Sequence, residues 1–313
     1  MSEIVINAQK LSKNFYNFDS RLPFIKRFLK RNQITIRAVQ DISFTIKRGS
    51  IVGFIGSNGA GKSTTIKMLT GTLYPSSGKL EVNGEIPFKR SINFRKKISI
   101  VVGNKLQLFQ DVSAMDYFQL IGTLYEVEPA ILQERIQELS NLLNVKDQLY
   151  QQVRTLSLGQ KMKMEFIAAS LTSPEILFLD EPTIGLDIQS KKDIRTFLKK
   201  MNEECHTTII LTSHDMDDIS SVCDELIVID KGKIILQESM DVILSKFSDF
   251  KYLKIKMTLD LVPELCSVKG VVVISQTKSE CILKIPRDFV FETLESINKL
   301  VDIEDFEISN LSL

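Results

Sequence analysis

The protein has 313 residues, of which 43% are hydrophobic and 25% charged, an ordinary globular composition that allows one large domain or one domain plus a smaller one. The formal net charge of +1 gives no general affinity for nucleic acid, and no apolar run approaches the ~20 residues that a membrane helix requires. Four cysteines without C-x-x-C spacing and only two histidines indicate reduced thiols rather than a zinc site, and the N-terminus has no signal-peptide pattern.

The first part of the chain predicts antiparallel strands at residues 4–8 and 40–47, where apolar and polar residues alternate. Between them lie Phe15 and Tyr16, aromatic residues that fit either stacking on a nucleotide base or packing in the core beside the sheet. Residues 19–38 interrupt these strands, and within them apolar residues from Leu22 to Leu29 lie at near-helical spacing with a basic opposite face. This pattern fits a surface helix packed on its own domain, or a basic amphipathic helix at a membrane or on a membrane partner.

The clearest motif begins after a short apolar run at residues 51–55. It fits the phosphate-binding pattern G-x-x-x-x-G-K-[ST] and reads Gly56-Ser57-Asn58-Gly59-Ala60-Gly61-Lys62-Ser63-Thr64. The strand before it and the helix expected at residues 65–69 supply the context that phosphate binding needs, because the loop amides and the helix N-terminus point at the anion. Lys62 is expected to reach the β- and γ-phosphates, and Ser63 to ligate Mg²⁺.

A second group of motif residues follows two more predicted strands. Residues 72–102 indicate a β-rich connection, and residues 112–172 have helical periodicity, which predicts a helical insertion at about 105–170. The apolar run 176–179 leads into Asp180 and Glu181, expected to hold Mg²⁺ and to activate the attacking water, respectively. Strand 208–212 leads to His214, a candidate contact of the γ-phosphate or a structural histidine.

The C-terminal part of the chain has a different pattern of predicted elements. A predicted hairpin at residues 226–236 closes the first domain, and residues 241–313 indicate a small α+β accessory domain. Its expected elements are strands at 252–256, 271–274, 281–285 and 303–308, and a helix at 289–300.

The segment Leu156-Ser157-Leu158-Gly159-Gln160 resembles the signature loop of ATP-binding-cassette (ABC) ATPases and stands 20 residues before Asp180 (160 to 180). Gly185-Leu186-Asp187 is similar to the D-loop of that family, and Thr212-Ser213-His214 to its switch-histidine loop. The resemblance covers roughly residues 3–240 and is greatest to the ATPase subunits of ABC-2-type exporters. It implies an α/β P-loop NTPase cassette over residues 1–240, with a mixed sheet core, an antiparallel β subdomain and the helical insertion.

The resemblance also assigns roles by position, with ATP and Mg²⁺ as ligands. It implies that Glu181, His214 and Lys62 are catalytic. It implies that Ser63, Asp180 and Asn104 bind the metal. The implied nucleotide-binding residues are Phe15, Gly56, Ser57, Asn58, Gly59, Ala60, Gly61, Lys62, Ser63, Thr64, Asn104, Ser157, Gly159, Gln160 and Asp187.

Two positions depart from the family pattern. Asn104 stands where the family has the Q-loop glutamine, so the amide is one methylene shorter, and Gln107 is near but offset. Leu158 stands where glycine is usual in the signature. The remaining motif residues predict ATP hydrolysis.

The resemblance finally predicts how the chain works. One phosphate loop and one signature imply that two cassettes pair head-to-tail around ATP, as a homodimer or with another cassette. A separately encoded permease at the membrane would bind the helical insertion, which places the chain on the cytoplasmic face as a peripheral protein with no nucleic-acid partner. The alternatives are a soluble ABC ATPase acting on ribosomes or DNA, and a binder that holds ATP without turnover.

Overall fold

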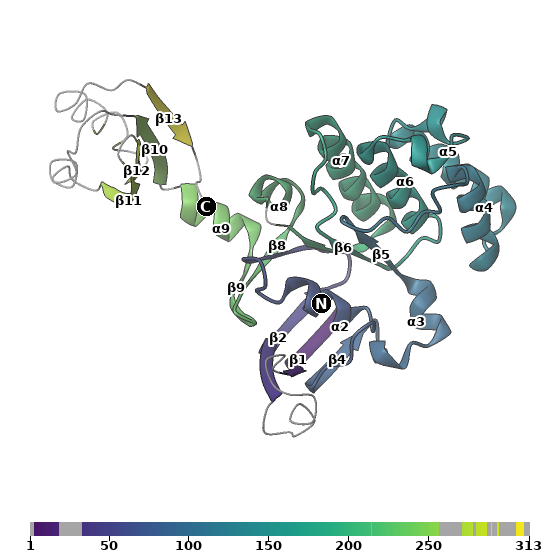
Figure 1. The fold of residues 1–313 in the computed structure, drawn as a ribbon, viewed down its shortest axis with the longest axis horizontal. Coiled ribbons are helices and arrows are strands. Elements are labelled where there is room, and N and C mark those ends of the chain that lie inside the picture. Colours follow the sequence, from purple (N-terminus) through teal and green to yellow (C-terminus); the bar gives the residue numbers. More distant parts are fainter. Residues whose placement is uncertain are drawn as a thin grey trace. The chain divides into compact units, whose positions relative to one another are not determined.

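The computed structural model describes residues 3–18, 33–213, 215–248, 250–256, 271–277, 280–286, 289, 293 and 305–309. The chain divides into two compact units, Met1–Glu238 and Ser239–Leu313 (Figure 1). Most of the predicted amphipathic segment, residues 19–32, lies outside the described residues. Within the part that is described, no helix has the length and apolar character needed to cross a membrane.

The first unit is built around a six-stranded sheet with the order β5-β6-β7-β3-β8-β9. Neighbouring strands from β5 to β8 pair in parallel. The apolar runs of β3, β6 and β7 are almost completely buried, as expected for parallel strands covered on both faces, and the strands predicted there are confirmed. The bounds are β3 Ile51–Ile55, β5 Ile98–Val102, β6 Ile176–Asp180, β7 Thr208–Thr212, β8 Glu225–Asp230 and β9 Lys233–Ser239.

A separate antiparallel sheet of three strands has the order β2-β1-β4 and consists of β1 Ile4–Phe18, β2 Gln33–Lys47 and β4 Ser77–Val82. The antiparallel region is confirmed, but its strands are longer than the predicted 4–8 and 40–47. Residues 33–38, expected to lie in the segment that interrupts the strands, are part of β2. Ladder pairs such as Phe15 with Ile36 continue the antiparallel pairing with β1 through this stretch, whose apolar residues Ile34 and Ile36 alternate as in a strand.

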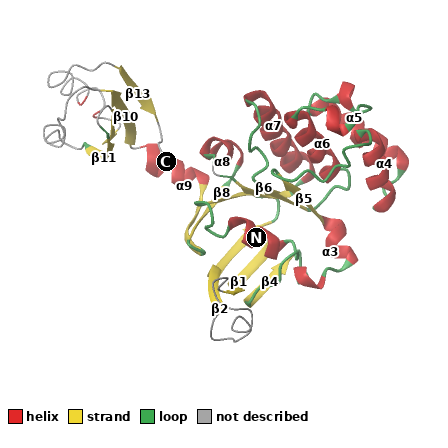
Figure 2. Ribbon diagram, viewed as in Figure 1, coloured by secondary structure: helices red, strands yellow, loops and turns green. Residues whose placement is uncertain are grey.

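Helices cover the six-stranded sheet. Helices α4 to α7 gather on one side of it and the three-stranded sheet lies on the other (Figure 2). The predicted helical insertion is confirmed as α4 to α6, but the predicted β-rich connection also contains the helix α3, which Ser91 caps by accepting the Phe94 N–H at 2.9 Å. The bounds are α2 Lys62–Leu69, α3 Ile92–Lys97, α4 Ala114–Leu124, α5 Pro129–Leu142, α6 Leu158–Ser170, α7 Ile188–Cys205 and α8 Met216–Val222, with 3₁₀ turns at Pro87–Lys89, Lys146–Gln148 and Val153–Thr155.

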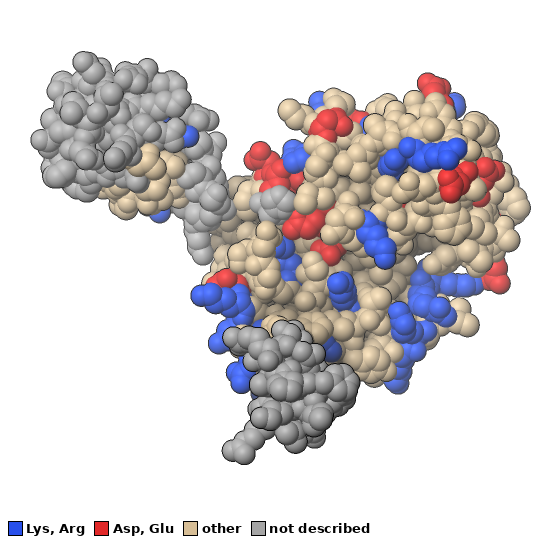
Figure 3. All heavy atoms as spheres, viewed as in Figure 1, with Lys and Arg blue, Asp and Glu red and all other residues tan. Residues whose placement is uncertain are grey.

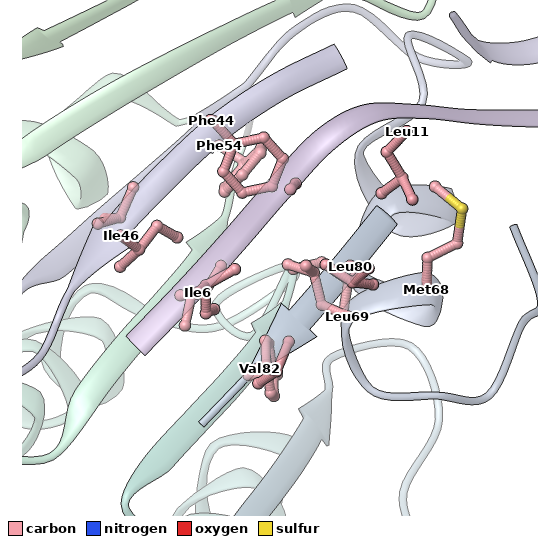
Figure 4. Packing of buried hydrophobic residues seen from close by; sticks show 14 of the residues in the cluster. Ile6, Leu11, Phe44, Ile46, Phe54, Met68, Leu69, Leu80 and Val82 are labelled. Atoms are coloured by element: carbon pink, nitrogen blue, oxygen red, sulfur yellow. The ribbon is translucent and has the colours of Figure 1, made fainter. Parts of the chain in front are cut away.

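A buried apolar cluster joins the two sheets (Figure 4). Phe44 of β2 meets Phe54 of β3 edge to face, with ring centroids 5.4 Å apart. Met68 and Leu69 of α2 belong to the same cluster and are fully buried. Helix α2, which follows the phosphate loop, is therefore held by the core of both sheets.

The second unit contains a four-stranded antiparallel sheet with the order β11-β12-β10-β13, preceded by the helix α9 Met240–Ser248. Its strands are β10 Phe250–Lys256, β11 Val272–Gln276, β12 Glu280–Pro286 and β13 Asp305–Ser309. The four predicted strands are confirmed, and α9 was not predicted. The helix predicted at 289–300 lies outside the described residues except for Phe289 and Thr293.

Replacing Phe44 with alanine tests how strongly the core joins the two sheets. We expect the free energy of unfolding to fall by about 3–5 kcal/mol, because a buried aromatic ring is lost and a cavity remains. Chemical denaturation measures this, with Ile36→Ala on the exposed face of the same strand as control. Equal, small losses in the two variants would show that the Phe44–Phe54 contact does not hold the sheets together.

Candidate functional site

The phosphate-loop motif forms the connection between β3 and α2. Gly61 has a φ of 111°, and a Cβ atom there would lie 2.6 Å from the Ala38 carbonyl oxygen, so only glycine fits. The loop borders a hollow of about 610 Å³. Its lining consists of Gly56, Ser57, Asn58, Gly59, Ala60, Gly61, Lys62, Ser63, Thr64, Asn104, Glu181 and Ile184. We call this hollow the phosphate cavity.

Lys62 places a cation at the phosphate cavity. Its side chain is only 6% exposed, and its ammonium donates to the carbonyl oxygens of Gly56 at 2.7 Å and Ser57 at 3.3 Å. The same nitrogen lies 3.8 Å from Glu181 Oε1. The cavity therefore has an ammonium and a carboxylate facing each other, an arrangement that can bind a phosphate and orient a water molecule beside it.

Asp180 is the meeting point of three elements. Its Oδ1 accepts hydrogen bonds from Ser63 Oγ of α2 at 2.9 Å and from Thr212 Oγ1 of β7 at 2.8 Å. A hydroxyl and a carboxylate beside a phosphate loop are the oxygen donors that Mg²⁺ prefers, so these residues fit that ion. Among the described residues, no group of three or more His, Cys, Asp or Glu side chains is placed to hold a metal ion.

Thr212 is a site residue whose contacts the sequence did not reveal. Besides donating to Asp180, its Oγ1 accepts the Glu181 N–H at 3.0 Å, and its carbonyl oxygen accepts the same N–H at 3.1 Å. Glu181 has a φ of 53°, a left-handed conformation that is unfavourable for a residue with a side chain. The sequence indicated Thr212 as the polar end of a predicted strand and as part of the segment similar to the switch-histidine loop. The structure adds that β7 pairs with β6, so that Thr212 lies opposite Asp180.

Asn104 and Gln107 lie on different sides of the segment that follows β5. Asn104 lines the phosphate cavity, whereas the Gln107 side chain donates to the Ile100 carbonyl oxygen at 2.9 Å and lines another hollow. The Gly103 N–H donates to the Asp180 carbonyl oxygen at 2.9 Å, which anchors the segment to β6. Asn104 is therefore the amide that faces the phosphate cavity.

The signature residues form the first turn of α6. Ser157 Oγ accepts the Gln160 N–H at 3.2 Å, and Gln160 Oε1 accepts the Ser157 N–H at 3.0 Å, which makes a reciprocal cap. Gly159 packs against the start of α7, where a Cβ would lie 2.2 Å from Ser190 Oγ. Asp187 caps α7, and hydrogen bonds from the Ser190 hydroxyl and then its N–H lower the pKa of the Asp187 carboxyl.

The structure does not bring the signature to the phosphate cavity. Ser157, Gly159, Gln160 and Asp187 are absent from the residues that line it in the described part of the chain. Phe15 does not line the cavity either, but Lys13, two residues before it, pairs with Val39, a neighbour of Gly61. His214 lies outside the described residues, while Ser213 and Asp215 on either side of it are described.

Thr212→Val tests the hydroxyl that joins Asp180 to Glu181. We expect the ATP hydrolysis predicted from the motifs to slow by about 10- to 100-fold, because Glu181 loses an anchor, with ATP affinity nearly unchanged. Steady-state kinetics and nucleotide titration measure the two effects. Thr208→Val is the matched control, since it removes a buried hydroxyl, bonded to the Gly49 N–H, from the other end of β7. Equal turnover in both variants would contradict this role of Thr212.

Comparisons with known proteins agree with this geometry. The family model described as ABC transporter matches residues 39–184. The ABC transporter ATP-binding protein NatA of Bacillus subtilis (strain 168) is 32% identical over 216 residues, which cover 69% of this chain and 87% of NatA. The linearmycin resistance ATP-binding protein LnrL of the same organism is 34% identical over 197 residues, 63% of each chain.

A solved structure gives the same result for the fold. The cbiO1 protein of Clostridium perfringens, described as part of the ABC transporter complex cbiONQ, superimposes with a TM-score of 0.64 at 26% identity. The match covers 78% of this chain and 92% of cbiO1. The predicted α/β P-loop NTPase fold is thereby confirmed, and the transporter relatives favour the transport function over the ribosome or DNA alternative. The chain belongs to the ABC transporter family, as an ATP-binding subunit that hydrolyses ATP.

Proposed function

We propose that the chain drives an ABC-2-type exporter from the cytoplasmic face of the membrane, as a peripheral subunit bound to a separately encoded permease. The observation that carries this proposal is the separation of the phosphate cavity from the signature within one chain. Two cassettes that pair head-to-tail bring the signature of each to the cavity of the other and so complete two sites. LnrL, named for linearmycin resistance, supports an export role by similarity.

The residues of the phosphate cavity have distinct roles in hydrolysis. The loop amides and Lys62 would bind the β- and γ-phosphates and stabilise the charge that develops in the transition state. Ser63 and Asp180, with Asn104 nearby, would hold Mg²⁺, which neutralises phosphate charge when bound. Glu181 would orient the attacking water and accept its proton, with His214 at the γ-phosphate. Phe15, or Tyr16 beside it, would stack on the adenine.

A second surface on the cassette fits a partner. A hollow of about 260 Å³, which we call the groove, lies between the α3 region and α4. Arg90 and Arg95 line one side, and neither forms an ion pair with any described residue. Tyr117, Ile121 and Tyr125 line the other side. Lys and Arg side chains also gather over the α3 region in the space-filling view (Figure 3).

This chemistry supports docking of a cytoplasmic segment of the permease. Apolar side chains of such a segment would pack on the α4 side, and an acidic side chain would pair with the arginines, which bind carboxylates in bidentate geometry. Because the groove adjoins the helical insertion, ATP-driven movement of the cassettes would be passed to the permease at this place. We further propose that residues 241–313 form an accessory domain of this subunit.

Glu181→Gln tests the catalytic assignment and the pairing together. We expect turnover to fall by about 10²–10⁴-fold, because the general base is lost, and Mg²⁺-ATP to convert the variant from monomer to dimer. Light scattering after size-exclusion chromatography and an ATPase assay measure these effects. Lys62→Ala serves as control, since it should lose ATP binding and the dimer as well. Unchanged turnover in Glu181→Gln would contradict the proposed base.

Arg90→Glu combined with Arg95→Glu tests the groove. We expect the membrane protein that copurifies with the tagged wild-type chain from native membranes to be lost, while the ATPase activity of the isolated cassette stays unchanged. Mass spectrometry of the purified complex measures this. Lys10→Glu with Lys79→Glu, a charge reversal on the three-stranded sheet, is the control. Copurification of the same membrane protein with the groove variant would contradict docking at the arginines.

A further inference from the structure

Glu165 of α6 is a buried acid that the proposed hydrolysis does not use. It is only 5% exposed, and one oxygen of its carboxylate, Oε1, accepts the backbone N–H groups of both Gln107 and Leu108, the latter at 2.8 Å. Burial raises the pKa of this carboxyl, against the opposing effect of the two backbone hydrogen bonds. A buried acid is costly, so its place in the structure needs a reason.

The two N–H groups belong to the short segment 103–108, which runs from the phosphate cavity to Glu165. At its start, the Gly103 N–H is bonded to the Asp180 carbonyl oxygen, and the next residue, Asn104, lines the cavity. At its end, Gln107 and Leu108 are bonded to Glu165. The segment 103–108 is therefore fastened to the strand that carries Asp180 at one end and to α6 at the other.

Helix α6 connects Glu165 to the signature residues at its N-terminus. Glu165 lies five residues after Gln160 on one uninterrupted helix, about 7.5 Å along its axis. The Glu165 side chain also lines the groove, together with Gln107. One side chain thus contacts the segment beside the phosphate cavity, belongs to the helix that begins with the signature, and faces the proposed permease surface.

We propose that Glu165 is a positioning residue that joins the Asn104 segment to the signature helix, so that ATP in the phosphate cavity and the permease in the groove both act on the placement of Ser157 to Gln160. The proposal rests on the proposed function, because it explains how two distant parts of one cassette move together. The link is a pair of hydrogen bonds to one oxygen, so it depends on an acceptor at the correct reach rather than on charge alone.

Three substitutions separate these properties. Glu165→Gln keeps the reach and an acceptor oxygen, Glu165→Asp keeps the charge but shortens the side chain, and Glu165→Ala removes both. Glu138→Ala on α5 is the control, because Glu138 is an exposed acid that pairs with Lys200 on the surface at 3.6 Å. If Glu165→Ala does not fold, Glu165→Asp tests the same link with a smaller change in volume.

The experiment uses the full chain in three measurements: binding of a fluorescent ATP analogue, Mg²⁺-ATP-dependent dimerisation in the Glu181→Gln background, and hydrogen exchange of residues 103–109. For Glu165→Ala and Glu165→Asp we expect ATP affinity within about twofold, dimerisation weakened by about tenfold or more, and faster exchange at 103–109. Glu165→Gln and Glu138→Ala should resemble the parent chain. The split between binding and dimerisation, and the rescue by glutamine, are effects that loss of stability alone does not produce.

Two results overturn the proposal. One is normal dimerisation by Glu165→Ala and Glu165→Asp, and the other is an equal loss of ATP affinity and dimerisation in them. A failure of the proposed function is distinguishable from both, because the chain with Glu165 intact would then show no Mg²⁺-ATP-dependent dimer at all.

Discussion

The site depends on the hydrogen bonds that hold Glu181 in a conformation it would otherwise avoid. A φ of 53° costs a residue with a side chain roughly 1–3 kcal/mol, so the surroundings must fix it. Thr212 does so by accepting the Glu181 N–H twice, through its hydroxyl and its carbonyl oxygen. Because the same hydroxyl donates to Asp180, which also accepts from Ser63, one chain of hydrogen bonds sets Glu181, Asp180 and the start of α2 relative to each other.

The hydrogen bonds of Ser157 and Gln160 in the signature are made within the first turn of α6 and need no nucleotide. Ser157 accepts from the Gln160 N–H, yet a hydroxyl has a hydrogen to donate as well, so it can bind a phosphate oxygen without giving up the cap. Around it the chain exposes apolar side chains, with Leu158 46% and Ile188 88% exposed. Such residues are costly in water and favourable in a paired interface. Leu158 in place of the usual glycine therefore fits a surface that another cassette covers.

The sequence predicted the parts of the site whose residues are adjacent in the chain. It predicted fewer of the contacts that form between segments far apart in the chain. The phosphate loop between a buried strand and a helix follows from local glycines and from apolar runs, and both were recognised. Residues 33–38 carry alternating apolar residues, Ile34 and Ile36, but fall in the expected interruption between the strands, and they pair with β1 as part of β2. Helix α3 depends on a single cap at Ser91 inside a stretch rich in strand signals. Thr212 and Glu165 act through partners 31 and 57 residues away, which no local pattern reveals.

Asn104 shows how the fold can accommodate a departure from a family pattern. Its amide is one methylene shorter than that of glutamine, and it nevertheless lines the phosphate cavity. The residue before it is Gly103, and a Cβ there would lie 1.9 Å from the Glu181 carbonyl oxygen. The missing side chain lets the backbone approach the end of β6 more closely than any other residue allows. Gly103 therefore holds the segment close to β6, and the next residue, Asn104, lines the phosphate cavity.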